Sequence, residues 1–584
     1  MSTSNDSDWF EAVKVEDLEK KGVMVVHGAG VPVAVFVHDG KISACDNRCP
    51  HLGFPLHKGT VEDGILTCHW HQARFDLCSG CTFDLFADDV PVYKTEVKDG
   101  IVHVATNPTQ LPDRGYYLRR LRKGMEQNIG GIIAKSVGSL HMNGGDDLDI
   151  IRAVAEYGSG NHDNWGDGMT TLSMVTNLLP YLSDETAYYA LFLAARRVAA
   201  NCAGATPRRL SEPLNTGEHS KETLKRWFRR WVYARRRAGA ERVALTAVEA
   251  GLSSAQMTDF YFGAATDRLY SATGHVFDLS NKAFELIDSL GEETGPDLLP
   301  LLMSNLSGSR GAEEDASWRH PVEIVEPLME VSEQLPQILN EGEGKSWEDD
   351  GSLTETLLGD EPLAIIEALT GALRSGAAPA ELSKRVAYAA AMRLARFSPN
   401  NEVGDWFNPQ HTFTYTNAVH QAVKRSPSPD VIRGVYHGAI SVYMDRFLNV
   451  PPAKMPGQKD SLDKLPTDAQ ELRDRFLDVL NHREEVDDAS CTVARYVQLG
   501  HPFEPLVETL TYATVREDVD FHYLQVLEGA VQQFQEWDGQ PEAEHIMVGV
   551  ARNLAAACPT RRAGLQVANV ALRLNRGEKI YEDD

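Results

Sequence analysis

The sequence has no long apolar run and few cysteines. No stretch of about 18 consecutive apolar residues occurs in its 584 residues, although a membrane-spanning helix needs one. Only eight cysteines are present, and their scatter does not form the framework of a disulfide-rich secreted domain. The first ten residues, MSTSNDSDWF, are polar and acidic and show no signal-peptide pattern. These features predict a cytoplasmic protein with no membrane partner.

Basic residues are also in deficit. The chain has 57 Lys and Arg against 84 Asp and Glu, a net charge of −27 with a pI near 5.1. Phosphate backbones attract basic surfaces, so we expect no nucleic-acid partner. A Gly-rich dinucleotide-binding turn is missing as well, because His27-Gly28-Ala29-Gly30 lacks both the third Gly and a following helix. No fused reductase is therefore predicted.

The cysteines that are present gather near the start of the chain in a specific pattern. C-P-H begins at Cys49, and C-H-W-H begins at Cys68 after sixteen residues that follow His51. Two Cys and two His in paired groups are what a Rieske [2Fe–2S] cluster needs. Cys49 and Cys68 would hold one iron, and His51 and His71 the other. Zinc also accepts two Cys and two His, which leaves a zinc site as the alternative.

The residues around this motif carry a family resemblance. The stretch CPHLGFPLHKGTVEDGILTCHWHQARFDLCSG resembles the soluble Rieske ferredoxins that serve aromatic-ring oxygenases. Rieske proteins of respiratory complexes carry one more Cys in each cluster loop, where this chain has Phe54 and Trp70. The resemblance covers about residues 8–107 and implies a low-potential, cytoplasmic electron carrier. Cys78 and Cys81 form a further C-x-x-C without a partner pair, and we assign them no role.

The domain organisation follows from a change in pattern along the chain. Residues 1–108 contain β-branched runs, such as 23–27 and 31–37, separated by Asp-Gly turns at 39, 63 and 99. Asn107-Pro108 and Leu111-Pro112 are typical of turns, and residues 109–115 form a linker. Residues 116–584 show the three- and four-residue apolar spacing of helices. The expected fold class is multidomain α+β: an all-β Rieske domain followed by a large all-α domain.

Helices are predicted throughout the second domain. The clearest segments are 171–182, 185–200, 240–249, 282–290, 364–373, 380–397, 429–447, 469–480 and 521–537. Ser183-Asp184 and Ser428-Pro429 match the residue preferences of helix starts. GHVFD at Gly274 is echoed by GHPFE at Gly500, which suggests an internal duplication.

Histidines in the helical domain predict a second metal site. The two-His pattern of ordinary Rieske oxygenase subunits is absent, and the domain is not β-rich. Five widely spaced histidines have similar contexts, and imidazole is a common ligand of non-haem iron. Helices can collect such ligands from distant segments, and a carboxylate one turn from His320 could join them. The candidate ligands are His162, His275, His320, Glu323, His411 and His501.

A second resemblance concerns the same histidines. The segments HDNW, GHVFD, HPVE, HTFTYTNAVH and GHPFEPLVETL are similar to parts of the questin-oxidase-like family, helical enzymes that oxidise or cleave polyketide aromatic rings. Some members hold a non-haem iron with four histidines and a carboxylated lysine. The resemblance implies four ligands in this chain, His162, His275, His411 and His501, with His320 as an alternate. Glu323 stands where the lysine would be.

These patterns predict a Rieske iron–sulfur oxidoreductase, an oxygenase whose [2Fe–2S] cluster feeds electrons to a mononuclear non-haem iron. Its partners would be an external reductase or ferredoxin, O₂ and a small organic substrate, aromatic or polyketide in nature. The prediction names no catalytic residue, and it is compatible with a homo-oligomer. The alternative is an electron carrier whose helical domain docks a separate oxygenase or reductase. A redox sensor with a helical interaction module is a third interpretation.

Overall fold

The computed structural model describes residues 8–110, 112–215, 219–458, 461–576 and 578. The acidic start at residues 1–7 and Leu111 of the predicted linker lie outside this part of the chain. The chain divides into two compact units, residues 1–153 with 564–584, and residues 154–563. Within the described residues, no helix is both long and apolar enough to cross a membrane.

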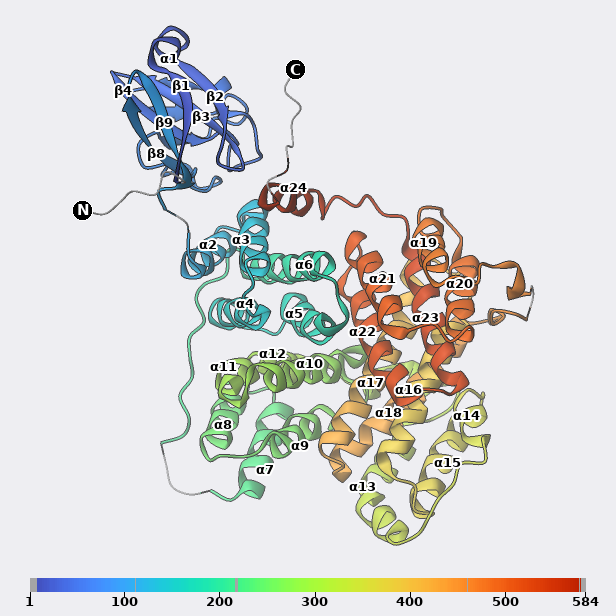
Figure 1. Cartoon of the computed structure of the whole chain (residues 1–584). Coiled ribbons are helices and arrows are strands. Elements are labelled where there is room, and N and C mark those ends of the chain that lie inside the picture. The colour runs from blue at the N-terminus through green and yellow to red at the C-terminus, as the bar shows by residue number, and fades with distance from the viewer. Residues whose placement is uncertain (1–7, 111, 216–218, 459–460, 577, 579–584) are drawn as a thin grey trace. The chain divides into compact units, whose positions relative to one another are not determined.

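The first unit begins with the predicted β domain (Figure 1). A six-stranded antiparallel sheet has the order β1-β9-β8-β4-β3-β2, and a smaller sheet has the order β5-β6-β7. The strands are β1 (Trp9–Lys14), β2 (Val23–His27), β3 (Pro32–His38), β4 (Lys41–Asp46), β5 (Thr60–Glu62), β6 (Ile65–Thr67), β7 (Arg74–Asp76), β8 (Val92–Lys98) and β9 (Ile101–Pro108), with one helix, α1 (Val15–Lys21).

The three predicted Asp-Gly turns set the register of this domain. They join β3 to β4, β5 to β6 and β8 to β9. In each turn both residues have positive φ, as at Asp39 (49°) and Gly40 (73°). This is the type I′ geometry that matches the twist of paired strands, and Asp-Gly adopts it readily. The all-β domain predicted from these turns is confirmed.

Helices also belong to the first unit. They are α2 (Arg114–Glu126), α3 (Gly130–Met142), the start of α4 (Asp147–Asn161) and α24 (Gln566–Asn575). Asp88 of the β domain binds Arg120 of α2 at 2.5 Å and Lys135 of α3 at 2.8 Å. The compact unit therefore extends beyond residue 108, the boundary predicted for the Rieske domain.

The second unit is helical, and the predicted large helical region is confirmed. Its helices are α5 (Asp167–Leu178), α6 (Asp184–Cys202), α7 (Lys221–Tyr233), α8 (Arg237–Glu249), α9 (Ser254–Ala265), α10 (His275–Leu290), α11 (Gly295–Leu298), α12 (Met303–Gly308), α13 (Val325–Gly342), α14 (Ser352–Leu357), α15 (Pro362–Arg374), α16 (Pro379–Ala395), α17 (Phe407–Arg425), α18 (Pro429–Met444), α19 (Ala469–Val479), α20 (Val486–Gln498), α21 (Phe503–Arg516), α22 (Phe521–Glu536) and α23 (Pro541–Ala557). Each predicted helical segment falls on one of them.

Local capping explains several of these helix starts. Ser183 accepts from the Thr186 N–H at the start of α6, and Ser428 accepts from the Val431 N–H at the start of α18. The helix α10 begins at His275, seven residues before residue 282, where the predicted helix began. Both echoed segments, at Gly274 and Gly500, precede helices, while the duplication itself stays a prediction.

A buried charge network ties α10 to α22. The Lys282 ammonium lies 2.7 Å from Glu285 and also binds Glu528 of α22. Asn177 of α5 donates to both carboxylates, at 2.9 and 2.7 Å. Burial raises the pKa of Glu528 to about 7, and the pair of carboxylates raises that of Lys282 in spite of its burial. These contacts fix the relative positions of three helices beside the candidate metal site.

Candidate metal centres

The predicted cluster ligands lie on two short loops that close on themselves. After β4, the Cys49 N–H donates to the Phe54 carbonyl at 2.8 Å, and the Gly53 N–H donates back to Cys49 at 2.7 Å. Between β6 and β7, the Cys68 N–H donates to the Ala73 carbonyl at 2.8 Å. Each loop thus presents one Cys and, two or three residues later, one His toward the same region.

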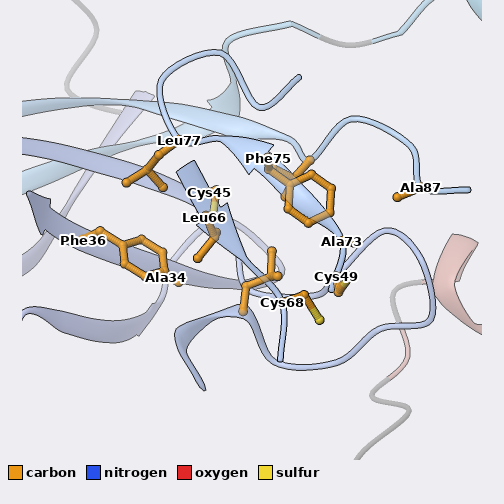
Figure 2. Packing of buried hydrophobic residues seen from close by; sticks show 12 residues of the cluster. Ala34, Phe36, Cys45, Cys49, Leu66, Cys68, Ala73, Phe75, Leu77 and Ala87 are labelled. Carbon is orange, nitrogen blue, oxygen red and sulfur yellow. The ribbon is translucent and has the colours of Figure 1, made fainter. Parts of the chain in front are cut away.

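The side chains on these loops converge. Cys49 and Cys68 are each 1% exposed and hydrogen-bond to each other. The rings of His51 and His71 stand edge to face with centroids 4.7 Å apart. The buried Nδ1 of His51 has no hydrogen-bond partner among the described residues, which fits a nitrogen kept for a metal. Figure 2 shows the two cysteines side by side at one end of an apolar core that includes Leu66 and Phe75.

Backbone amides surround the two sulfurs. Cys49 accepts from the amides after it, and Cys68 accepts from those of Trp70 and His71. The hydrogen bond from Cys49, together with these amides, lowers the pKa of Cys68 to about 6, while the same pairing and burial raise the pKa of Cys49. One thiolate is therefore already favoured, and amide donors to sulfur stabilise the second when a cluster binds. The four residues fit a Rieske [2Fe–2S] cluster.

A charged residue from α3 reaches the first cluster loop. The Lys135 ammonium donates to the Pro50 carbonyl at 2.5 Å, between the two ligands of that loop. Its side chain is only 12% exposed, and its counterion is Asp88. Because Asp88 also pairs with Arg120, the three groups together carry one net positive charge beside the cluster ligands.

In the second unit, three histidines form a group with metal-binding geometry. His275 begins α10, His411 lies in the first turns of α17, and His522 is the second residue of α22. The His522 Nε2 lies 3.0 Å from the His411 Nε2 and 3.3 Å from the His275 Nε2. Two nitrogens about 2.1 Å from one ion, at angles of about 90–110°, are about 3.0–3.4 Å apart. The group therefore matches three imidazole ligands of a single ion.

Carboxylates orient two of these rings. The Nδ1 of His522 lies 2.9 Å from Asp520, and the Nδ1 of His275 lies 3.3 Å from Asp278. Asp278 is 1% exposed and also accepts from Thr414 at 3.0 Å. A carboxylate only accepts, so each Nδ1 carries a proton, and Nε2 is the nitrogen through which each ring can bind a metal ion. Two ring nitrogens at this distance require either a proton or a metal ion between them.

Burial and neighbouring charges keep His411 without a proton. Burial, with the charges of His275 and His522, lowers the pKa of His411 to about 3. Burial alone would lower the pKa of His275, but Asp278 outweighs it and raises that pKa. At neutral pH His411 is therefore an unprotonated ligand.

The other predicted ligands do not lie in this group. Glu323 binds Arg319 at 3.2 Å and accepts from the Val325 and Glu326 amides at the start of α13, and His320 is exposed nearby. The Nδ1 of His162 lies 2.7 Å from the Asn164 carbonyl. The Nε2 of His501 lies 3.0 Å from the Thr467 carbonyl. The structure brings together His275 and His411 from the predicted set and adds His522.

His522 was not predicted because its sequence context, DFHYL, does not resemble those of the other candidate histidines. The local sequence pattern is Asp520-Phe521-His522. Asp520 is the N-cap residue of α22, and its carboxylate accepts from the His522 amide at 2.8 Å and also binds the His522 ring. Such an Asp-x-His at a helix start fixes both the backbone and the imidazole. This pattern could have marked the residue before the structure was known.

The fold and the cysteine–histidine loops of the first unit define an iron–sulfur electron-transfer domain. The family model for the Rieske [2Fe-2S] domain matches residues 8–94. The chain belongs to the Rieske [2Fe–2S] family, and this membership rests on its N-terminal part.

Several curated relatives are similar to that part. The ferredoxin component of naphthalene 1,2-dioxygenase/salicylate 5-hydroxylase systems from Ralstonia sp. is 30% identical over 95 residues, 16% of this chain and 89% of the relative. The naphthalene 1,2-dioxygenase ferredoxin of Pseudomonas putida is 36% identical over 72 residues, 12% of this chain and 69% of the relative. A 4beta-methylsterol monooxygenase of Methylococcus capsulatus is 39% identical over 75 residues, 13% of this chain and 20% of that protein.

Proposed function

We propose that this chain is a Rieske oxidoreductase of the oxygenase type with a second metal centre in its helical unit. The [2Fe–2S] cluster of Cys49, His51, Cys68 and His71 would supply single electrons. An iron held by His275, His411 and His522 would supply O₂-dependent oxidation of a small organic substrate. An external reductase or ferredoxin would deliver the electrons, and the proposed location is the cytoplasm.

The observation that carries the second centre is the convergence of three Nε2 atoms, two of them on rings whose Nδ1 is held by a carboxylate. A structural histidine usually satisfies both nitrogens with donors and acceptors of the protein. Here the Nδ1 atoms of His275 and His522 donate to Asp278 and Asp520, and their Nε2 atoms face each other. A set of three imidazoles suits iron, zinc, copper and nickel. The electron-transfer domain in the same chain favours iron, because zinc accepts no electrons.

A cavity adjoins the group and supplies room for a substrate. It measures about 340 Å³, and His411 is part of its wall. This is within the range of small-molecule sites, roughly 300–1,000 Å³. In the proposed reaction, His275, His411 and His522 hold the metal, Asp278 and Asp520 keep the rings in place, and the cavity orients the substrate. The resemblance to questin-oxidase-like enzymes supports oxidation of an aromatic ring as the reaction class.

Metal content of anaerobically purified protein, measured together with EPR, tests this proposal. Wild type should contain a third metal atom in addition to the two cluster irons. His411→Ala and His522→Ala should lose the third metal and keep the Rieske signal. The matched controls are His162→Ala and His501→Ala, since these histidines bond to backbone carbonyls and should keep all three metals. Two metals in wild type, or a third metal that is retained in both His411→Ala and His522→Ala, would contradict the proposal.

A second candidate is an electron carrier with a helical docking domain. The ferredoxin components among the relatives favour it, because they are carriers in multi-protein systems. In that case the purified chain contains two irons, and the His411→Ala and His522→Ala variants transfer electrons like wild type.

A further inference from the structure

The cavity beside His411 has a polar floor whose hydrogen bonding is incomplete. Asp445, at the end of α18, lines it and is only 6% exposed. Its Oδ2 atom is buried and has no hydrogen-bond partner among the described residues. A carboxylate oxygen that is kept away from water and has no donor is energetically costly, more so when the group is charged. Such an atom on a cavity wall is suited to a donor that the ligand brings.

Neighbouring hydroxyls already satisfy one another. Thr412 and Ser441 lie 3.0 Å apart, and the Tyr270 hydroxyl is within hydrogen-bond reach of both. Burial raises the pKa of Asp445 to about 7, although a hydrogen bond with the Thr412 side chain and the charge of Arg393 both act to lower this pKa. Titratable groups whose pKa is shifted strongly by the surroundings of a cavity are frequent at functional sites.

The backbone around the cavity mouth is strained. Tyr270, Ala272 and Thr273 have φ values of 43°, 50° and 53°, in the left-handed region, and all three line the cavity. This conformation is unfavourable for a residue with a Cβ, and especially for β-branched Thr. The strained segment leads directly into His275 and places the Tyr270 ring beside Trp318, with centroids 6.2 Å apart. Strain of this kind is retained mainly at ligand sites.

We propose that Asp445 is the specificity-determining residue of this cavity, where its free oxygen accepts a hydrogen bond from a hydroxyl group of a neutral, one- or two-ring organic ligand. Tyr270 and Trp318 supply the apolar and aromatic wall for the ring. The inference rests on the proposed function in taking the ligand of this cavity as the substrate of the His411 centre.

Charge and polarity select this ligand class. A ligand carboxylate would be repelled by Asp445, and Arg310, a cation of the cavity lining, is exposed to solvent. The Arg393 charge already acts on Asp445 and lowers its pKa, which weakens the attraction of this carboxyl for a ligand ammonium. A hydroxyl donor meets neither penalty and can extend the chain of Thr412 and Ser441 hydroxyls. An ether of the same shape lacks the donor and leaves the Asp445 oxygen unsatisfied.

Calorimetric titration of the full-length protein with 2-naphthol and with 2-methoxynaphthalene, its methyl ether, tests the inference. Wild type at pH 7.5 should bind 2-naphthol at least about tenfold more tightly than the ether, as expected for loss of a hydrogen bond to a buried charged group. Asp445→Asn and Asp445→Leu should each reduce this preference to about threefold or less. The control Asp315→Asn removes an exposed carboxylate on the rim of the same cavity and should leave the preference unchanged.

Equal binding of the two compounds, no saturable binding of 2-naphthol to wild type, or a preference that survives both Asp445 variants would overturn the inference. Circular dichroism of each variant verifies folding, and the isosteric Asn variant keeps the test valid if the Leu variant does not fold. Metal content is measured on the same samples. Asp445-dependent binding with only two metals per chain would retain this ligand site and reject the proposed iron centre. Three metals without hydroxyl preference would do the reverse.

Discussion

Replacing Asp445 by Asn should stabilise the protein, and increasingly so as the pH rises. Asp445 is buried, and its pKa is raised from the usual 3.8 to about 7. Below about pH 4 the carboxyl is protonated in both the folded and the unfolded chain and makes no difference. Between pH 4 and 7 the unfolded chain releases this proton while the folded chain keeps it, so the free energy of unfolding falls with rising pH.

The size of this effect follows from the pKa difference. About three pKa units at about 1.4 kcal/mol each give about 4 kcal/mol, which is fully present above pH 7. The second unit spans residues 154–563. Its entropy of unfolding is about 0.9 kcal/mol/K at the typical value per residue, so 4 kcal/mol corresponds to about 5 °C in Tm.

Thermal unfolding followed by circular dichroism at 222 nm, from pH 4.5 to 8, measures this difference. Asp445→Asn should match wild type in Tm at pH 4.5 and exceed it by about 5 °C at pH 8. Asp315→Asn, the exposed control, should follow wild type at every pH. A Tm difference that is constant with pH, or that shrinks as the pH rises, would refute the raised pKa of a buried Asp445. A stabilising variant that loses ligand preference would show that the carboxyl is kept for function at a cost in stability.

Three further predictions follow from the charged contacts. Lys135→Met should lower the midpoint potential of the [2Fe–2S] cluster, because a positive charge beside the ligands favours the reduced state. Redox titration by EPR should show the wild-type potential in Lys135→Arg. A wild-type potential in Lys135→Met would contradict this role. Lys282→Met removes the ammonium between two buried carboxylates and should lower the free energy of unfolding by about 3–5 kcal/mol. Urea denaturation should show a lower midpoint. A midpoint like that of wild type would show that the network is dispensable. Asp520→Ala removes the carboxylate that holds the His522 ring and should weaken binding of the third metal about 10- to 100-fold. Competition with a chelator measures this affinity. An unchanged affinity would mean that the carboxylate does not orient the ring.

The sequence predicted the first metal centre residue by residue because its ligands are local. Cys49 and His51 share one loop, and Cys68 and His71 share another, so their spacing along the chain reports their spacing in space. The Asp-Gly turns similarly gave the strands, since type I′ hairpins depend on adjacent residues. Helices in the second unit were found from apolar spacing and caps, with errors of a few residues at their ends.

The second centre depends on contacts between distant segments. His522 is 111 residues from His411 and 247 from His275, and only the packing of α10, α17 and α22 places its Nε2 atom 3.0 Å and 3.3 Å from theirs. Repeated sequence contexts suggested His162 and His501, but those rings bond to nearby backbone carbonyls instead. Composition and motif spacing determined the β domain, its cluster ligands and the helical character of the rest. Tertiary packing alone decided which histidines meet and that Asp445 lines the cavity beside them, because helix–helix contacts, unlike turns and loops, are not encoded by neighbouring residues.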